Sequence, residues 1–245
     1  MELKAWRWAL ERRCILLGEN PLSAKPVVKS SAKSKRSRQS RDPEATKAKI
    51  LDAAEEEFAR YGLAGARTEP MAANIGVTKA MIHYYFGTKE ELYQAVLERY
   101  AATFLVAVET LNLENLSPPE VLRTFLRAAV AHEVNHPYQG KVLLHEAMSN
   151  EGKYFKLTGW EVPINLGVTF LQKGVDEGYF RPLDPWLIMI HIMGTVTFYF
   201  NAENNLRNLV PASDWLAPQA IEAYAESAIA FILAGVLKHP EVGGV

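Results

Sequence analysis

Cysteine is almost absent from this sequence of 245 residues. The single Cys14 excludes an internal disulfide framework and a cysteine-rich zinc site, and it fits a reducing cytoplasm. No run of 18 uninterrupted apolar residues occurs, so we predict a cytoplasmic protein with no transmembrane helix and no membrane partner. Arg7, Glu11, Arg12 and Arg13 interrupt the first apolar segment, so we expect no secretory signal peptide.

Sequence motifs of common enzyme classes are also missing. We find no nucleophile elbow, phosphate-binding glycine loop, dinucleotide-binding fingerprint or metalloprotease helix. His132 and His136 stand four residues apart and could share a helix face, but a zinc site needs three or four converging ligands. We therefore predict no enzymatic activity, no cofactor and no metal site, and we keep an unrecognised helical enzyme as an alternative.

The positive charge is concentrated at one end of the chain. Residues 1–41 contain eleven Lys or Arg and three acidic residues, whereas residues 42–245 contain sixteen Lys or Arg and twenty-five acidic residues. We expect residues 1–41 to be a disordered basic extension, because Ser, Pro, Lys and Arg dominate its second half. Such an arm suits a polyanion partner, and a solvated tail without a partner is the alternative.

From Pro43 onward the apolar residues recur with helical spacing, and few strand-like alternations occur. Glycine and proline divide the chain into segments that we predict to be helices: 44–62, 68–75, 78–85, one that starts at 88, 119–135, 138–150, 162–178, 184–204 and 214–237. The predicted fold class is all-α, with an N-terminal three-helix unit followed by a C-terminal helical bundle.

The segment 67–86 has the spacing of a helix-turn-helix. Gly76 permits the left-handed backbone of a tight turn, and the apolar Val77 can fill the gap between the two helices. The next helix should begin at Thr88, because Glu91 three residues later completes a capping box. A helical bundle with an ordinary exposed face is the alternative.

Residues 44–100 resemble the TetR family of transcriptional regulators. The resemblance lies in the "ILDAA…F…YG" first helix, the "MAANIGVTKAMIHYYF" helix-turn-helix and the trailing "GTKEELYQAV". It implies a DNA-binding domain over 42–90, a ligand-binding and dimerisation domain over 91–245, and double-stranded operator DNA as a partner. The residues that it places at the DNA are Thr68, Thr78, Lys79, Ala80, His83, Tyr84 and Lys89.

Two features depart from the family pattern. His83 stands where the family often has Tyr, and Tyr85 stands where it often has His. Glu69 lies near the expected DNA surface, where a carboxylate would repel phosphate, and we expect it to serve the first turn of its helix instead.

The C-terminal half is rich in aromatic residues and methionine, which suits a small-molecule pocket in a helical bundle. It resembles the subgroup of TetR regulators that includes pyrimidine-utilisation regulators. The candidate pocket residues are Met148, Phe155, Trp160, Phe170, His191 and Tyr199.

The last two long predicted helices, 184–204 and 214–237, carry apolar faces that we expect to form a homodimer. We predict a repressor that a small-molecule effector releases from its operator; an architectural DNA-binding protein without ligand control is the alternative.

Overall fold

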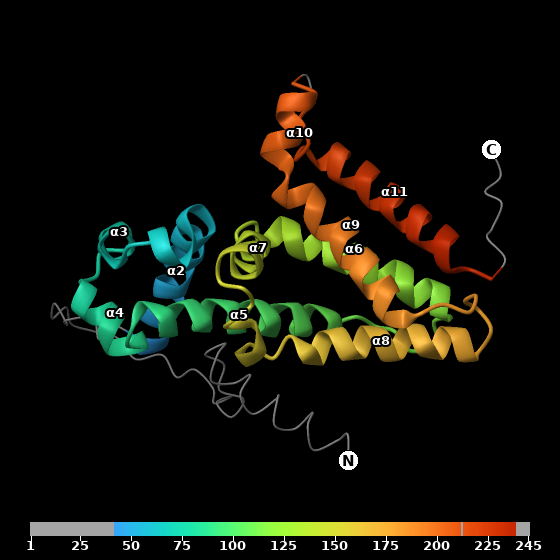
Figure 1. Cartoon of the computed structure of the whole chain (residues 1–245), viewed down its shortest axis with the longest axis horizontal. Coiled ribbons are helices and arrows are strands. Elements are labelled where there is room, and N and C mark those ends of the chain that lie inside the picture. Colours follow the sequence, from blue (N-terminus) through green and yellow to red (C-terminus); the bar gives the residue numbers. More distant parts are fainter. Residues whose placement is uncertain (1–41, 212, 239–245) are drawn as a thin grey trace, which may run out of the picture.

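The computed structural model describes residues 42–211 and 213–238. Over those ranges the fold is all-α, as predicted, and the one β feature is an isolated bridge between Phe180 and Leu237. Figure 1 shows a small N-terminal group of helices joined to a larger C-terminal bundle by one long helix.

Three helices form the N-terminal unit: α2 (Pro43–Gly65), α3 (Thr68–Asn74) and α4 (Lys79–Phe86). Helix α2 starts where the sequence predicts, because the Asp42 carboxylate accepts a hydrogen bond from the Glu44 amide at 3.0 Å and Pro43 occupies the first turn. The helical geometry of α2 breaks at Gly62, whose φ is 64°. The predicted end at this glycine is therefore a kink, after which three more residues belong to the helix.

Helix α5 (Lys89–Glu109) connects the two parts of the molecule. Its capping box is present as predicted: the Glu91 amide donates to Thr88 Oγ1 at 3.1 Å, and the Thr88 amide donates to Glu91 Oε2 at 2.7 Å. Along its length α5 packs first on α2 and α4 and then on α6, α7 and α8 (Figure 1). One continuous helix therefore touches both the DNA-binding unit and the C-terminal bundle.

The C-terminal bundle has six α-helices and a short 3-10 helix in the described residues. They are α6 (Pro118–Asn135), α7 (Gln139–Ser149), η1 (Phe155–Leu157), α8 (Glu161–Asp176), α9 (Pro185–Asn201), α10 (Glu203–Leu209) and α11 (Pro218–Val236). The predicted helix 184–204 is correct over most of its length but extends too far, because α9 ends at Asn201, the chain turns at Ala202 and α10 begins as a separate helix (Figure 1). The sequence analysis also missed η1.

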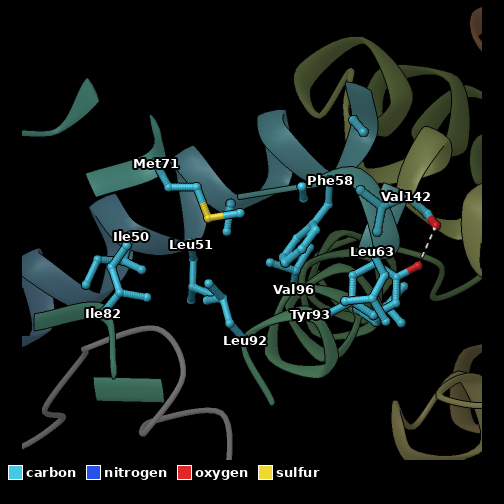
Figure 2. Close-up of a cluster of buried hydrophobic side chains, with 14 of the residues drawn as sticks. Ile50, Leu51, Phe58, Leu63, Met71, Ile82, Leu92, Tyr93, Val96 and Val142 are labelled. Carbon is cyan, nitrogen blue, oxygen red and sulfur yellow. Dashed lines mark hydrogen bonds between the residues drawn. The ribbon is translucent and has the colours of Figure 1, made fainter. Parts of the chain in front are cut away.

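Two main apolar clusters hold these helices together. The first joins α2, α3, α4 and α5, with Phe58 and Tyr93 completely buried and edge to face at 4.9 Å between ring centroids. Val142 of α7 belongs to this cluster, and its carbonyl accepts a hydrogen bond from the Tyr93 hydroxyl (Figure 2). The second cluster joins α6, α8, α9 and α11. Helix α7 is thus anchored in the core of the DNA-binding unit although it follows the bundle helix α6 in sequence.

Helix α11 is long and apolar enough to cross a membrane, and 33% of its most apolar 18-residue stretch is buried in the protein. A single helix of this kind is weak support for a membrane span, since a core helix of a soluble protein has the same composition. In this fold α11 packs on α6 and α9.

Candidate functional site

The segment between α3 and α4 has the geometry of a helix-turn-helix. Gly76 adopts a φ of +67°, a conformation that costs glycine little, and the Val77 amide donates to the Ala72 carbonyl at 3.0 Å to close the turn. Met71 and Ala72 of α3 and Ile82 of α4 are buried in the same cluster, with Val77 packed against it. The turn chemistry that the sequence predicted is therefore present.

One face of α4 is free to meet a partner. The residues that the resemblance placed at the DNA and that are exposed on α4 or at its N-cap are Thr78, Lys79, Ala80, His83 and Tyr84. Tyr84 is 82% exposed, and Thr78 caps the helix by accepting from the Met81 amide. Thr68 differs, because it is 8% exposed at the start of α3 and offers little surface.

Lys79 forms an ion pair with a carboxylate of the neighbouring helix α3. Its Nζ lies 2.6 Å from Glu69 Oε1, and this bond is the main cause that lowers the pKa of the Glu69 carboxyl. Glu69 is in the first turn of α3, as expected, but Arg67 occupies the N-cap and makes no side-chain capping bond. The carboxylate therefore aims Lys79 across the turn between α3 and α4.

Lys89 has a structural contact that the sequence analysis did not foresee. Its Nζ donates to the Ala66 carbonyl at 3.1 Å and to the Ala64 carbonyl at 3.4 Å, both at the end of α2. The side chain thus ties the start of α5 to the end of α2. A phosphate at the N-terminus of α5 would have to share this ammonium with the two carbonyls.

Two adjoining cavities lie among α5, α6, α8 and α9, with volumes of ≈ 50 Å³ and ≈ 300 Å³. They share a wall made of Phe125, Pro163, Met189 and Ile192. The narrower cavity is bounded by a cluster of rings in which Trp160 meets Tyr100 at 4.7 Å and Phe104 at 5.6 Å between ring centroids. Such an apolar space with few polar groups is typical of a small-molecule site.

A buried carboxyl group faces the narrower cavity. Glu133 of α6 is 5% exposed, and its Oε1 accepts a hydrogen bond from the Tyr100 hydroxyl at 2.8 Å. Burial raises the pKa of Glu133 to about 7, and the Tyr100 bond lowers it in part. Burial likewise raises the pKa of the Tyr100 phenol well above its usual value.

A ring stack followed by buried hydrogen bonds connects the cavity wall to the DNA-binding unit. The His132 ring stacks on Tyr100 at 5.5 Å, and His132 Nε2 lies 3.2 Å from Gln139 Oε1. Gln139 Nε2 donates to Glu55 Oε1 of α2 at 2.9 Å. Arg99 of α5 donates to the same Glu55 oxygen through Nε at 2.9 Å.

These hydrogen bonds determine which ring nitrogen of His132 carries the hydrogen. Since the Gln139 amide nitrogen donates to Glu55, its oxygen is the acceptor toward His132, and His132 Nε2 therefore carries the hydrogen. Burial lowers the pKa of His132 to about 4, with a smaller contribution from His136. The imidazole is neutral at physiological pH and serves as a fixed donor.

The six predicted pocket residues do not all lie together. Trp160 lines the narrower cavity, Phe170 lines the wider one, and Phe155 packs against Trp160. Met148 is 74% exposed on α7, and His191 is exposed on α9. Tyr199 is buried, but it stacks on Tyr224 at 3.8 Å and donates to the Trp215 carbonyl, so it joins α9 to α11. Neither cavity is therefore lined by Met148, His191 or Tyr199.

Sequence reasoning missed Glu133, Gln139 and Glu55. Charged and amide residues in amphipathic helices are mostly solvent-exposed, so nothing in the pattern marked these three as buried. The available signal was Gly140, where a β-carbon would lie 2.8 Å from Glu133 Oε2 and 2.8 Å from the Asn201 amide nitrogen. A glycine in the first turn of a helix indicates the close approach of other elements.

In the residues that the structure describes, no group of three or more His, Cys, Asp or Glu side chains is arranged to hold a metal ion. His132 and His136 do adjoin, at 4.5 Å between ring centroids.

Comparison with known proteins identifies both halves of this arrangement. Residues 50–96 match the bacterial regulatory proteins of the tetR family, and residues 115–241 match the tetracyclin repressor-like C-terminal domain. The chain belongs to the TetR family. It is therefore a DNA-binding transcriptional regulator with an N-terminal helix-turn-helix, as the sequence predicted.

Several TetR family regulators are similar to it individually. The HTH-type transcriptional repressor SCO4008 of Streptomyces coelicolor is 36% identical over 108 residues, which are 44% of this chain and 53% of that protein. The HTH-type transcriptional regulator RutR of Escherichia coli K12 is 27% identical over 164 residues, 66% of this chain and 77% of RutR. The structure of the ketosteroid transcriptional regulator KstR2 of Mycobacterium tuberculosis, 21% identical, has the same fold at a TM-score of 0.63 and covers 79% of this chain and 96% of its own.

Proposed function

We propose that this TetR family regulator is a cytoplasmic repressor that binds an operator as a homodimer and leaves it when a small effector occupies the cavities beside α5. The observation that carries the proposal is the buried path from the cavity wall to α2. Tyr100 lines the narrower cavity and stacks on His132. His132 is hydrogen-bonded to Gln139, and Gln139 donates to Glu55 of the DNA-binding unit. A regulatory protein without ligand control would have no need of an apolar cavity joined to its DNA-binding unit.

The proposed DNA contacts are the exposed residues of α4. Thr78, Lys79, His83 and Tyr84 carry donors for phosphate or base edges, and Ala80 can touch a thymine methyl group. We retain Lys89 for the phosphate backbone and Thr68 as a minor contact. The DNA-binding domain of this proposal extends over 42–90 and the ligand-binding and dimerisation domain over 91–245, with residues 1–41 as a basic extension outside the described residues.

The proposed dimer interface lies on α9 and α11. Trp186, Ile190 and Phe198 are at least half exposed on one stripe of α9 and are spaced by multiples of four residues. Phe231 of α11 is 72% exposed. Gly194 in the α9 stripe has open space where a β-carbon would stand, so a helix of a second copy can approach closely there. A two-fold axis at this face would place the two α4 helices in successive major grooves.

A selection from random duplex DNA with the purified full chain tests the DNA half of the proposal. We expect enrichment of a two-fold symmetric sequence whose half-sites are about 34–36 Å apart, one helical turn. The Lys79→Ala variant should enrich the same sequence poorly or not at all. Enrichment of asymmetric or unrelated sequences would contradict the proposed dimeric operator complex.

A thermal-shift screen followed by operator titration tests the effector half. Compounds that bind the native protein raise its melting temperature, and we expect some of them to weaken operator binding by about 1–3 kcal/mol. Trp160→Glu and Phe170→Glu should abolish that response, because both side chains line the cavities. If stabilising compounds are found and none of them changes operator affinity, ligand control is refuted.

A further inference from the structure

Two hydroxyl groups in the wall of the narrower cavity can act only as hydrogen-bond acceptors. The Tyr100 hydroxyl donates its proton to Glu133, and the Thr197 hydroxyl donates its proton to the Met193 carbonyl at 2.7 Å. Both hydroxyl oxygens can then only accept. Trp160 Nε1 is a donor without a partner, but it is buried among side chains and exposes almost no surface.

The charged side chains in the walls of the two cavities are all acidic. Glu133 is the ionisable acid in the wall of the narrower cavity, and none of the described residues that line either cavity is Lys, Arg or His. A buried carboxylate is normally compensated by a cation or by several donors. Among the described residues, Glu133 accepts a side-chain hydrogen bond from the Tyr100 hydroxyl alone, so its charge is only partly compensated.

Aromatic rings border this carboxyl. Tyr100, Phe104 and Trp160 form one contact cluster, and Phe125 meets Phe104 at 6.0 Å between ring centroids. The faces of such rings attract a cation, most strongly when water is excluded. Two hydroxyl groups that can only accept, one carboxyl group and a ring cluster are together complementary to a protonated nitrogen.

We propose that the effector is an organic amine, a primary or secondary ammonium group attached to an apolar body. The ammonium lies in the narrower cavity and donates to Glu133, while the apolar body extends past Phe125 and Met189 into the wider cavity of ≈ 300 Å³. This inference rests on the proposed effector function and specifies its ligand. The wider cavity is apolar along Leu166, Phe170 and Leu171, which matches a hydrocarbon or aryl group.

The test compares three probes that share one apolar body: 4-phenylbutylamine, 4-phenylbutanol and 4-phenylbutyrate. Isothermal titration on the full chain at pH 8 should show the amine binding at least about tenfold more tightly than the alcohol, because a hydrogen bond to a charged group is worth more than a neutral one. The carboxylate probe should bind most weakly, since it would meet Glu133 with the same charge.

Two variants test whether Glu133 causes the preference for the amine over the alcohol. Glu133→Gln has the same shape and can still accept from Tyr100, and it should bring amine and alcohol affinities to within about threefold of each other. Retained alcohol binding in that variant shows that it is folded. Glu161→Gln, which removes an exposed carboxylate at the start of α8 outside both cavities, should keep the wild-type preference.

The pH dependence gives a second readout. Amine affinity should rise with pH up to about 7, where Glu133 ionises, whereas alcohol affinity should not. The groups that face Glu133 are Tyr100 from α5, its neighbour His132 on α6, Gly140 from α7 and Asn201 and Thr197 from α9. Tyr100 stays protonated and His132 neutral across this range, because the pKa of each is shifted away from it.

Several results would overturn the inference. Equal affinity for amine and alcohol, or no saturable amine binding at millimolar concentration, would show that the cavities do not select an ammonium group. An unchanged preference in Glu133→Gln would show that Glu133 does not hold it. Loss of the preference in Glu109→Gln instead would move the ammonium to the wider cavity, which Glu109 lines. The proposed function fails on different results, namely the absence of a symmetric operator or of any operator response to stabilising compounds.

Discussion

Lys79 and Glu69 form an exposed ion pair on the surface that we propose to face DNA, with side-chain exposures of 50% and 62%. A DNA phosphate or base must compete with Glu69 for the Lys79 ammonium. The carboxylate also repels the DNA backbone wherever it stands, so it lowers affinity for any sequence. The pair can therefore set the balance between specific and non-specific binding.

Separate substitutions should divide these two effects. Lys79→Ala should weaken operator binding by about 1–3 kcal/mol if the ammonium reads a base edge. Glu69→Gln should strengthen binding to all sequences and steepen the salt dependence, because one repulsive charge is removed. Fluorescence anisotropy at several salt concentrations measures both, and unchanged affinity in both variants would refute the assignment of α4 to the DNA.

Glu133 and His132 should have opposite effects on stability as the pH changes. The folded pKa of Glu133 is raised to about 7, so its stabilisation is present below its unfolded pKa and is lost as pH rises through 7. The folded pKa of His132 is lowered to about 4, so its stabilisation is present above its unfolded pKa and is lost as pH falls through 4. The two effects oppose each other over nearly the same range.

Removing Glu133 should expose the histidine effect. In Glu133→Gln the free energy of unfolding should increase between pH 4.5 and 6.5 by on the order of 1.4 kcal/mol per pH unit, whereas the wild type should change less. Urea denaturation at a series of pH values provides the measurement. A Glu133→Gln profile as flat as that of the wild type would show that His132 is not held neutral.

At the scale of elements, the start of α7 joins three other helices through Gln139, which is 2% exposed. Its amide group contacts Glu55 of α2, Thr103 of α5 and His132 of α6. Helix α7 also contributes Val142 to the core of the DNA-binding unit (Figure 2). A shift of α6 caused by a ligand at Glu133 would therefore be transmitted to α2 through α7 as well as through α5.

A double-mutant cycle should measure this link. Gln139→Leu leaves His132 Nε2 without its buried acceptor and removes one of the two side chains that donate to Glu55, and it should lower the free energy of unfolding by about 1–3 kcal/mol. Combined with Glu55→Gln, it should show a coupling energy of about 0.5–3 kcal/mol. Combined with Glu44→Gln at the exposed start of α2, it should be additive within about 0.5 kcal/mol. Additivity in both pairs would contradict the hydrogen-bonded path.

At the scale of the whole molecule, the proposed homodimer requires an apolar surface that the protomer does not bury itself. The exposed apolar stripe on α9 and the exposed Phe231 of α11 lie on helices that also supply the second core cluster. Not every apolar residue of these helices can meet a second copy, because Ile188, Ile192 and Ile232 are buried within one protomer. The surface that is free for a partner is therefore Trp186, Leu187, Ile190, Phe198 and Phe231.

Charged substitutions on this surface should separate the dimer. Ile190→Asp and Phe231→Glu should yield monomers in sedimentation velocity and weaken operator binding, because a single α4 helix reads half of a symmetric site. Leu157→Asp is a matched control, since Leu157 is 58% exposed on η1 rather than on α9 or α11. A dimer that survives both substitutions would place the interface elsewhere.

The N-terminal unit could be predicted closely from the sequence alone. Asp42 and Pro43, Gly76, and the Thr88–Glu91 capping box act within a few residues of themselves, so the starts of α2 and α5 and the turn between α3 and α4 follow from local backbone chemistry. Apolar periodicity likewise determined the all-α class. The exposed residues of α4 were implied by the resemblance to the TetR family, and the apolar pattern agrees, because Ile82 of α4 is buried in one cluster with Met71 and Ala72 of α3.

What only the tertiary structure decided is which polar side chains are buried and which apolar ones are not. Helix α9 is apolar on several sides, so its sequence cannot distinguish the core residue Ile192 from the exposed Ile190. Glu133 is buried because α5, α7 and α9 close around it, with Gly140 allowing the approach, and Gln139 is buried between α2, α5 and α6. Burial depends on contacts between segments far apart in the chain, and periodicity within one helix carries no information about them.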